Sequence, residues 1–143
     1  KLCGLTFVIQ MGDEVDVIDE KILKSHPNFQ LLKKTSKVLF RTRNSSYWST
    51  YPTEFQLNYV GIDKSGARFL EDLGLDLVGI DYLSVASFQD TKSPHEILLS
   101  SEVVLLEGLN LSKVKGGVYN LFCLPLNISN CDGSPARAIL VEY

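Results

Sequence analysis

The sequence predicts an α/β fold, with a mixed β-sheet and short helices. Apolar segments rich in β-branched and aromatic residues recur along the chain, as buried strands require. Helix-start signals lie between them, and the order strand, helix, strand over residues 38–80 is typical of a crossover connection in a parallel or mixed sheet. The length of 143 residues, with 45% apolar residues, predicts a single domain over 1–143 with a substantial core.

The first third of the chain is predicted to form a strand, a helix and a second strand. Residues 5–11 read LTFVIQM, a buried-strand composition. Asp19 can cap a short helix over 20–25, which must end before Pro27 because proline disfavours a helical residue ahead of it. Residues 38–42 form the next predicted strand.

The segment 44–58 is polar, has no clear period and is expected to be an irregular loop. Its aromatic side chains support two interpretations. They line a substrate pocket, or they pin a surface loop to the core. The residues concerned are Tyr47, Trp48, Tyr51 and Phe55.

A helix over 64–73 is predicted to follow, capped by Asp63 and ended by Gly74 in a left-handed conformation. Its inner face is apolar, as an amphipathic helix requires. A strand over 75–80 comes directly after it.

Residues 93–96 carry the sharpest local signal. Ser93 can cap a helix, Pro94 fits the first helical position, and Glu96 completes a capping box. A short helix over 96–101 and a strand over 102–109 should follow. Beyond a Gly-Gly turn, we expect a strand over 118–128, in which Pro125 marks an edge or bulge, and a last strand over 136–143.

Composition excludes several classes of protein. The net charge of −3 gives no basic face for nucleic acid. No apolar run approaches the roughly 18 residues of a membrane-spanning helix. Three cysteines match neither a disulfide scaffold nor a zinc motif. A Cys123–Cys131 bridge stays possible, although two buried thiols fit better.

Localisation stays open between cytoplasmic and secreted. Three Asn-x-Ser sequons, at Asn44, Asn110 and Asn127, would permit glycosylation of a secreted eukaryotic protein. The chain starts at Lys1 rather than methionine, which we expect to reflect an upstream part that is removed or not represented.

His95 and Glu107 are the candidate metal ligands. A histidine at a helix start is kept neutral by the local field, as a metal ligand must be. Glu107 ends an apolar run, and both side chains can converge on one spot. Zinc or manganese could use both, but catalytic zinc takes three protein ligands, and His26 is a poor third. The alternative is a hydrogen-bonded histidine and a partly buried, paired acid.

The residues support no other catalytic assignment. No serine–histidine–aspartate arrangement and no glycine-rich phosphate loop is recognisable, so no catalytic or cofactor-binding residue is predicted. Asp81, directly after a strand, would be a second carboxylate supporting the metal site or, more commonly, a turn-stabilising aspartate.

Several segments, in this order, resemble the cyclase family of metal-dependent hydrolases, which includes bacterial kynurenine formamidase and plant cyclase-like proteins. The matching text is LVGIDYLSVASF, SPHEILL, VVLLEGL, YNLFCLPLNI and GSPARAILVEY, together with KVLFRTR and YVGIDKSGARFLEDLGLDLVGID. The resemblance implies a swivelling β/β/α domain and one or two divalent ions, zinc or manganese. It implies hydrolysis of small-molecule amides such as N-formylkynurenine or isatin. It also implies that His95 and Glu107 are metal ligands, that Asp81 and Arg137 are structural, and that the chain forms a homo-oligomer.

The family signature His-x-Gly-Thr-His-x-Asp-x-Pro does not occur in 1–143. We therefore expect the chain to be the C-terminal portion of such a domain, with its N-terminal part missing. Amide hydrolysis would need the remaining ligands from that part, and the chain alone would be inactive. The alternative is a truncated, catalytically inactive relative that acts as a binding or interaction protein.

Overall fold

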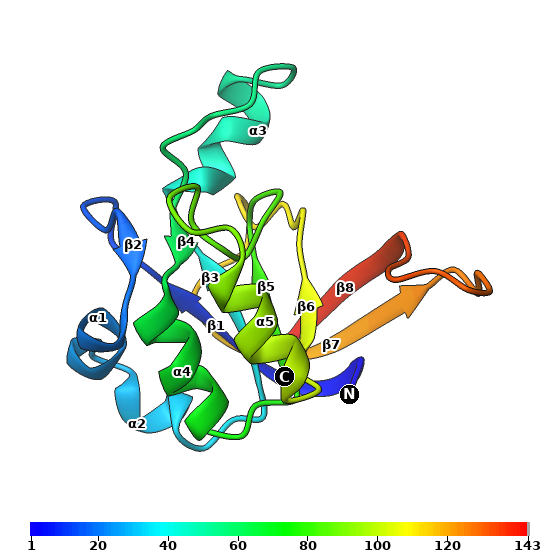
Figure 1. The fold of residues 1–143 in the computed structure, drawn as a ribbon, viewed down its shortest axis with the longest axis horizontal. Coiled ribbons are helices and arrows are strands. Elements are labelled where there is room, and N and C mark those ends of the chain that lie inside the picture. The colour runs from blue at the N-terminus through cyan, green and yellow to red at the C-terminus, as the bar shows by residue number, and fades with distance from the viewer. Residues whose placement is uncertain (143) are drawn as a thin grey trace.

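The computed structural model describes residues 1–142 and shows a six-stranded sheet with helices against one face (Figure 1). The sheet strands are β1 (Cys3–Gln10), β3 (Lys37–Arg41), β5 (Leu77–Ile80), β6 (Val104–Leu106), β7 (Gly117–Pro125) and β8 (Ala136–Glu142). A separate pair consists of β2 (Val17–Ile18) and β4 (Gly61–Ile62). The helices are α1 (Glu20–Ser25), α2 (Phe29–Leu32), the 3-10 turn η1 (Arg43–Ser46), α3 (Tyr47–Thr50), α4 (Lys64–Asp72) and α5 (Ser93–Ser100).

The strand order is β6-β5-β3-β1-β7-β8, and the sheet is mixed as predicted. β1, β3, β5 and β6 are parallel to one another, whereas β7 is antiparallel to both β1 and β8. The carboxyl ends of β3, β5 and β6 therefore meet at one edge, where open α/β sheets place their sites.

Local capping accounts for the predicted helices α1 and α4. The Asp19 carboxylate accepts a hydrogen bond from the Ile22 amide at 2.6 Å, and Asp63 accepts one from Gly66 at 2.8 Å. Gly74 ends α4 with φ of +68°, the left-handed conformation predicted for it. Within residues 1–142, no helix combines the length and apolar character needed to cross a bilayer.

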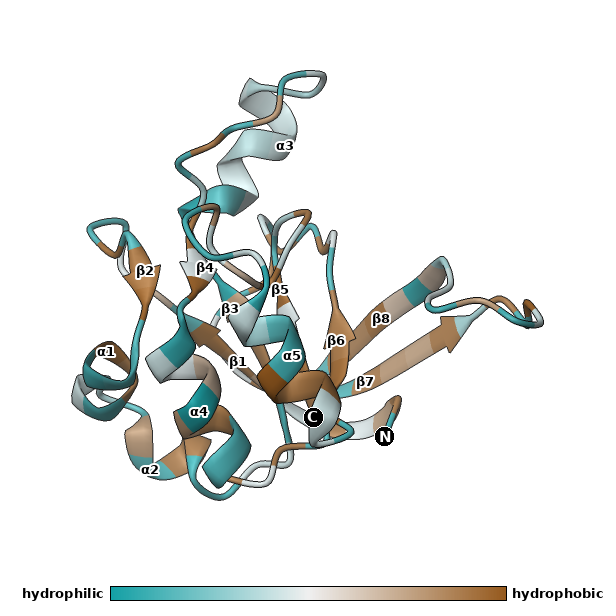
Figure 2. Cartoon of the chain, in the orientation of Figure 1, coloured by the Kyte–Doolittle hydropathy of each residue, from teal (hydrophilic) through white to brown (hydrophobic). Residues whose placement is uncertain are grey.

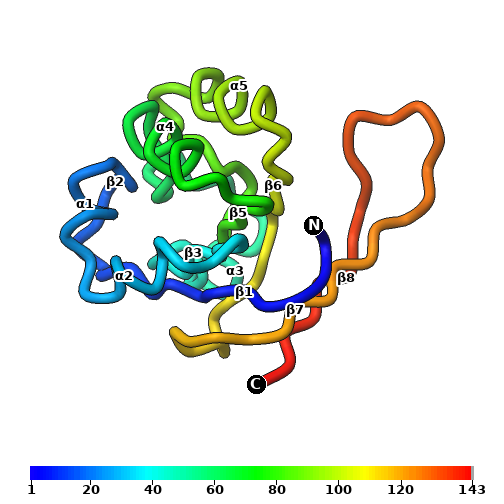
Figure 3. The backbone as a smooth tube through the Cα atoms, turned by 90° about the horizontal axis from the view of Figure 1, so that it is seen from below, coloured from blue at the N-terminus to red at the C-terminus, as the bar shows by residue number. Residues whose placement is uncertain are grey.

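The core has two layers, one on each side of the sheet. Figure 3 shows α1, α2, α4 and α5 gathered on one side. The larger cluster lies there, with Ile9, Phe40 and Ile80 of the strands against Leu70 and Leu98 of the helices. A smaller cluster covers the other face; it includes Val8, Leu39, Leu77, Leu111 and Leu121.

The β7–β8 hairpin carries apolar side chains that no helix covers. The two strands extend away from the helical layer and are largely apolar along their length (Figure 2). Alternate residues face outward, and Phe122, Leu124, Ile139 and Val141 are 44–58% exposed. Across the ladder Phe122 lies opposite Ile139, whereas Leu124 lies opposite Arg137 and Val141 opposite Asn120.

The prediction of an irregular loop over 44–58 is wrong for its first part, which forms η1 and α3. The Thr42 hydroxyl accepts a hydrogen bond from the Asn44 amide and starts η1. Asn44 is fully buried, and its side chain bonds both the amide and the carbonyl of Val60. That sequon is therefore inside the folded protein.

The predicted capping box at Ser93 is also wrong. α5 begins at Ser93 itself, and Asp90 supplies the local acceptor, with Oδ1 receiving the amides of Lys92 at 3.2 Å and Ser93 at 2.9 Å. Asp90, three residues upstream, thus fixes the backbone that leads into the helix, and Ser93 is a helical residue and not the cap. β2 and α2 were not predicted, because two and four residues are too short to show a period.

The strands predicted over 102–109 and 118–128 are shorter in the structure. β6 covers 104–106 rather than 102–109, because Glu102 at φ +57° and Gly108 at φ +71° break the extended backbone on both sides. β7 ends at Pro125, which cannot donate to the ladder. The predicted last strand includes Tyr143, which lies outside the described residues.

The cysteines of the described chain are all free. Cys123 is buried as expected, but Cys131 is exposed, so the expectation of two buried thiols is wrong for Cys131. The Cys123–Cys131 bridge is not formed.

Asp81 is a buried carboxylate that holds residues 42–45 over the end of β5. It is fully buried, and its Oδ2 accepts from the Thr42 amide at 2.7 Å, the Ser45 amide at 3.1 Å and the Ser45 hydroxyl at 2.6 Å. Its Oδ1 accepts from the Thr42 hydroxyl at 2.8 Å. The Asp81 carbonyl also accepts from the Trp48 ring Nε1 at 3.2 Å. The chain leading into α3 is therefore fixed to β5 by polar contacts away from water.

We expect Asp81→Ala to lower the free energy of unfolding by about 3 kcal/mol, because it leaves buried donors of Thr42 and Ser45 without an acceptor. Asp81→Asn should cost less, since its side-chain oxygen still accepts. Urea unfolding of both variants against the parent chain measures this. Equal stabilities for Asp81→Ala and the parent would contradict the structural role.

The contribution of Asp81 to stability should also depend on pH. Burial raises the pKa of the Asp81 carboxyl, and the hydrogen bonds from Ser45 and Thr42 offset part of that rise. The folded state then keeps its proton at pH values where the unfolded chain has lost it, so this stabilisation is complete below the unfolded pKa and is lost as pH rises through the folded pKa. The stability of the parent relative to Asp81→Asn should therefore fall as the pH rises from the carboxyl's ordinary pKa through its raised folded-state pKa. A difference that grows with pH in parallel unfolding curves would refute the assignment.

Candidate metal centre

His95 lies in the first turn of α5, and a backbone carbonyl fixes its ring. Its Nδ1 is 2.8 Å from the Thr91 carbonyl oxygen, which can only accept, so Nδ1 carries the proton and donates. The Asp90 contacts at Lys92 and Ser93 hold the loop that presents this carbonyl. In a neutral ring, Nε2 is then the atom with a free lone pair.

Glu107 directly follows β6, and a backbone amide fixes its carboxylate. Its Oε1 accepts from the Val85 amide at 2.8 Å. The next residue, Gly108, turns the chain at φ +71° and donates its amide to the Tyr82 carbonyl at 2.7 Å. The segment after β5 thus holds both the backbone and the side chain of this turn.

The two side chains meet, with His95 Nε2 3.1 Å from Glu107 Oε1. They are 30% and 35% exposed, so the pair is open to solvent and to an ion. Because Nδ1 holds the ring proton, a neutral His95 and an ionised Glu107 present two lone pairs to each other. A shared cation, either a proton on Nε2 or a metal ion, relieves that repulsion. The predicted convergence is confirmed, whereas the metal role stays a prediction.

The donor chemistry fits a divalent metal. A neutral imidazole nitrogen suits zinc, a carboxylate oxygen suits zinc and manganese, and the Thr91 carbonyl orients the ring as second partners of metal-bound histidines do. Across residues 1–142, no group of three or more His, Cys, Asp and Glu side chains could hold an ion. His26 lies elsewhere, with its ring bonded to the Gln10 carbonyl and the Asn28 amide.

Asp81 does not support this pair, because its carboxylate bonds Thr42 and Ser45. Tyr59, by contrast, lies near Glu107. Burial raises the pKa of the Tyr59 phenol, a hydrogen bond with Ser84 lowers it, and the nearby charge of Glu107 raises it further. The Tyr59 hydroxyl donates to the Ala86 carbonyl at 2.7 Å.

The structure supports the pinned-loop interpretation of the aromatic segment, and it shows a pocket there whose use for a substrate stays a prediction. Trp48 is pinned through its Nε1, which donates to the carbonyls of Asp81 and Leu109 at 3.2 and 2.9 Å. The aromatic side chains also line a pocket of about 230 Å³; its walls include Tyr47, Trp48, Tyr51, Phe55, Tyr82 and Leu83.

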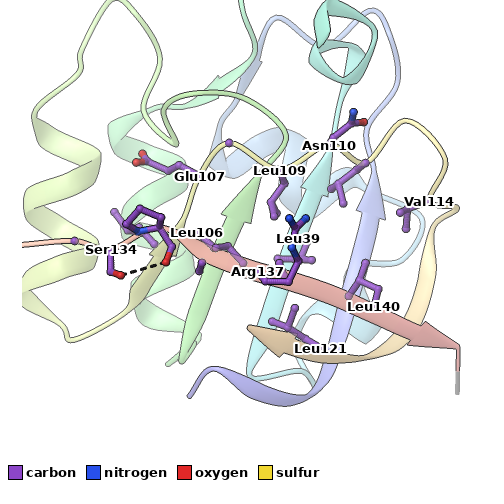
Figure 4. Close-up of a pocket in the computed structure, with 17 residues that line it drawn as sticks. Leu39, Leu106, Glu107, Leu109, Asn110, Val114, Leu121, Ser134, Arg137 and Leu140 are labelled. Carbon is purple, nitrogen blue, oxygen red and sulfur yellow. Dashed lines mark hydrogen bonds between the residues drawn. The ribbon is translucent and has the colours of Figure 1, made fainter. Parts of the chain in front are cut away.

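A second cavity, of about 620 Å³, lies on the sheet face opposite the helices (Figure 4). Glu107 sits at its margin, and leucines of the smaller core cluster form much of its wall. Arg137 lines it as well and, in Figure 4, points toward Leu109. Its predicted structural role has no hydrogen bond or ion pair to support it among the described contacts.

The groups that sequence reasoning missed are mostly backbone atoms, namely the Thr91 carbonyl and the Val85 amide. No residue type marks them, because every residue carries the same backbone groups. Tyr82 could have been noticed as a polar aromatic residue after a buried strand.

No model of a known protein family matches the chain. Known proteins do: the chain is 39% identical to cyclase-like protein 2 of Arabidopsis thaliana over 143 residues, covering 99% of this chain and 51% of that protein. It is 30% identical to kynurenine formamidase of Bacillus cereus over 145 residues, covering 98% of this chain and 67% of that protein. The chain thus spans about half the length of the plant relative.

A solved structure described as a potential metal-dependent hydrolase with cyclase activity superposes with a TM-score of 0.82 at 29% identity. The match covers 97% of this chain and 65% of that one, and confirms the predicted fold class. Sequence and fold agree, and the chain belongs to the cyclase family of metal-dependent hydrolases, together with cyclase-like proteins and kynurenine formamidases.

Proposed function

We propose that the chain contributes to the metal site of an amide hydrolase resembling kynurenine formamidase, with His95 and Glu107 as metal ligands. The observation that carries the proposal is the 3.1 Å approach of His95 Nε2 to Glu107 Oε1. The similarity to kynurenine formamidase supports a formamide or related amide as the small-molecule substrate.

The chain's own residues prepare the two donor atoms. The Thr91 carbonyl keeps the ring proton on Nδ1, so that Nε2 is free to bind a cation. The Val85 amide holds Oε1 of Glu107 in place, and Oε2 remains as a second donor. Both side chains are thus set before the ion arrives, which lowers the cost of ordering them.

When bound, a divalent ion, zinc or manganese, supplies charge that polarises the amide carbonyl and makes water easier to deprotonate. Water adds to the carbonyl carbon, the C–N bond breaks, and the amine leaves with a proton. Two protein ligands are fewer than the three of catalytic zinc sites. We therefore propose that the remaining ligands and the proton-transferring base come from outside the described residues, and that the isolated chain does not turn over substrate.

A second candidate is a binding protein without turnover. The number of potential ligands favours it, because the described residues bring only two together, His95 and Glu107. The two candidates differ in metal dependence. The hydrolase needs His95 to hold the ion, whereas a binding protein should bind its partner equally well in the parent and in His95→Ala. Association between copies of the chain, expected from the resemblance, remains a proposal.

In a polypeptide that also carries the remaining ligands, we expect His95→Ala and Glu107→Gln each to weaken Zn²⁺ or Mn²⁺ binding by about a hundredfold, because each removes or weakens a ligand. Calorimetric titration of the ion into each variant measures the effect. His26→Ala is the matched control and should bind as the parent does, since its ring bonds only the Gln10 carbonyl and Asn28 amide. Identical Kd values in parent, His95→Ala and Glu107→Gln would exclude the pair as a metal site.

Metal removal should abolish hydrolysis in a polypeptide that also carries the remaining ligands. Dialysis against a chelator should reduce the rate of formanilide hydrolysis to the uncatalysed rate, and Zn²⁺ or Mn²⁺ should restore it. The isolated chain should show only the rate of the free ion. Turnover that persists after complete chelation, checked by elemental analysis, would overturn the proposal in favour of a metal-independent mechanism.

A further inference from the structure

Three Asn-x-Ser sequons, at Asn44, Asn110 and Asn127, are motifs that the candidate metal centre does not use. In such a sequon an oligosaccharide is joined to the side-chain amide of the asparagine. The transferase has to hold the asparagine, the residue that follows it and the serine hydroxyl together, so all three must be within its reach. The fold places the three sequons in different surroundings, and the structure therefore distinguishes between them.

The sequon at Asn44 is closed by the fold. Asn44 is fully buried; its Oδ1 accepts the Val60 amide at 2.8 Å, and its Nδ2 donates to the Val60 carbonyl at 2.8 Å. The next residue, Ser45, is 5% exposed, and its hydroxyl donates to the buried Asp81 carboxylate. A sugar on Nδ2 would displace packed side chains and leave the Val60 groups without partners, which costs free energy. An oligosaccharide on Asn44 is therefore incompatible with this fold.

The sequon at Asn110 lies at the surface, but it is held in place. The Asn110 Oδ1 accepts the amide and the hydroxyl of Ser112, at 3.2 and 2.7 Å. Leu111, between these two residues, is 3% exposed and belongs to the smaller core cluster. The preceding carbonyl, that of Leu109, accepts from Trp48 Nε1 at 2.9 Å. A transferase can hold this sequon only after Leu111 has left the core.

The sequon at Asn127 differs from the other two. Asn127, Ile128 and Ser129 are all exposed, in the loop that joins β7 to β8. The side-chain hydrogen bonds of this loop come from Cys131 and Ser134, and within residues 1–142 the Asn127 amide group and the Ser129 hydroxyl take part in none. The loop extends away from the helical layer (Figures 1 and 3). A transferase can therefore hold this sequon without moving any packed side chain.

We propose that Asn127 is an N-glycosylation site of the folded chain and that Asn44 and Asn110 stay unmodified. The donor is an oligosaccharide linked to a lipid through a diphosphate, the substrate of transferases in the secretory lumen. The Asn127 Nδ2 attacks the anomeric carbon of the sugar, and an N–C bond forms. The C–O bond to the diphosphate breaks, and the diphosphate leaves with the bonding electrons. The amide proton passes to a base of the transferase.

This site is independent of the proposed amide hydrolase. Asn127 lines neither the cavity that Glu107 borders nor the pocket beside α3. Its neighbours Leu126 and Ile128 are already 61% and 48% exposed, so an attached oligosaccharide uncovers no core residue. The site also lies after the last residue of β7, so the sugar interrupts no hydrogen bond of the strand ladder.

The test uses the purified folded chain, an oligosaccharyltransferase and its lipid-linked donor. One oligosaccharide should be added to each chain. An amidase that removes it converts the modified asparagine to aspartate, so peptide mass spectrometry identifies the position, which should be Asn127. Short synthetic peptides that span each sequon are the reference, because they carry the same residues without the fold. All three peptides should be accepted, whereas the folded chain should accept the sugar only at Asn127.

Four variants of the chain sharpen the test. Asn127→Gln and Ser129→Ala should each abolish the modification, because they remove the acceptor amide and the required hydroxyl. Ser129→Thr keeps a hydroxyl and should be modified as the parent is. Asn130→Gly is the matched control in the same loop. Asn130 is exposed, has φ of +55°, which glycine adopts readily, and is followed by Cys131 and Asp132, so it forms no sequon. It should also be modified as the parent is.

Three results would overturn the proposal. The first is a folded chain that stays unmodified, whether or not the Asn127 peptide is accepted. The second is an oligosaccharide mapped to Asn44 or Asn110 of the folded chain, or one that persists in Asn127→Gln. The third is rejection of the Asn44 and Asn110 peptides, which would show that local sequence and not the fold makes the selection.

Discussion

The buried carboxylate of Asp81 is the constraint on which the arrangement of the site depends. It stands at the end of β5 and fixes Thr42 and Ser45, the residues that lead from β3 into α3. The residues that follow Asp81 include Tyr82, which lines the pocket beside α3, and Val85, whose amide bonds Glu107. One buried carboxylate therefore fixes the segment that leads into α3 to the end of β5, the same strand end from which the chain continues to Val85 and its contact with Glu107. Buried donors tolerate few alternative arrangements, because each lost contact costs free energy.

The proposed metal ligands are held in a different way, by single backbone groups. The Thr91 carbonyl determines which nitrogen of His95 carries the proton, and the Val85 amide determines where Oε1 of Glu107 lies. Neither contact involves a charged partner, so the pair keeps its attraction for a cation. The carboxyl-end edge of β3, β5 and β6 brings these backbone groups together.

Sequence patterns predicted the elements whose causes are local. Asp63 and Gly74 bound α4 as expected, since a cap and a left-handed glycine act within a few residues of themselves. The same logic failed at Ser93, which is the first helical residue, while Asp90 accepts the amides of Lys92 and Ser93. It also failed at Asn44, a polar residue in a sequon that the fold buries against Val60. At the start of α5, the local sequence does not decide whether Asp90 or Ser93 accepts the free amides. For Asn44, the partner lies sixteen residues away, beyond the reach of any local pattern.

The sequence by itself determined that an imidazole would stand at a helix start and a carboxylate at a strand end. Capping and hydrophobic periodicity depend on neighbours along the chain. Only the tertiary structure decided that His95 and Glu107, twelve residues apart, approach to 3.1 Å, and that the Val85 amide holds the Glu107 carboxylate. Those facts depend on strand register and on backbone amides and carbonyls that every residue shares. Chain neighbours can specify a helix or a strand, but only packing of the whole sheet selects which identical backbone groups meet which side chains.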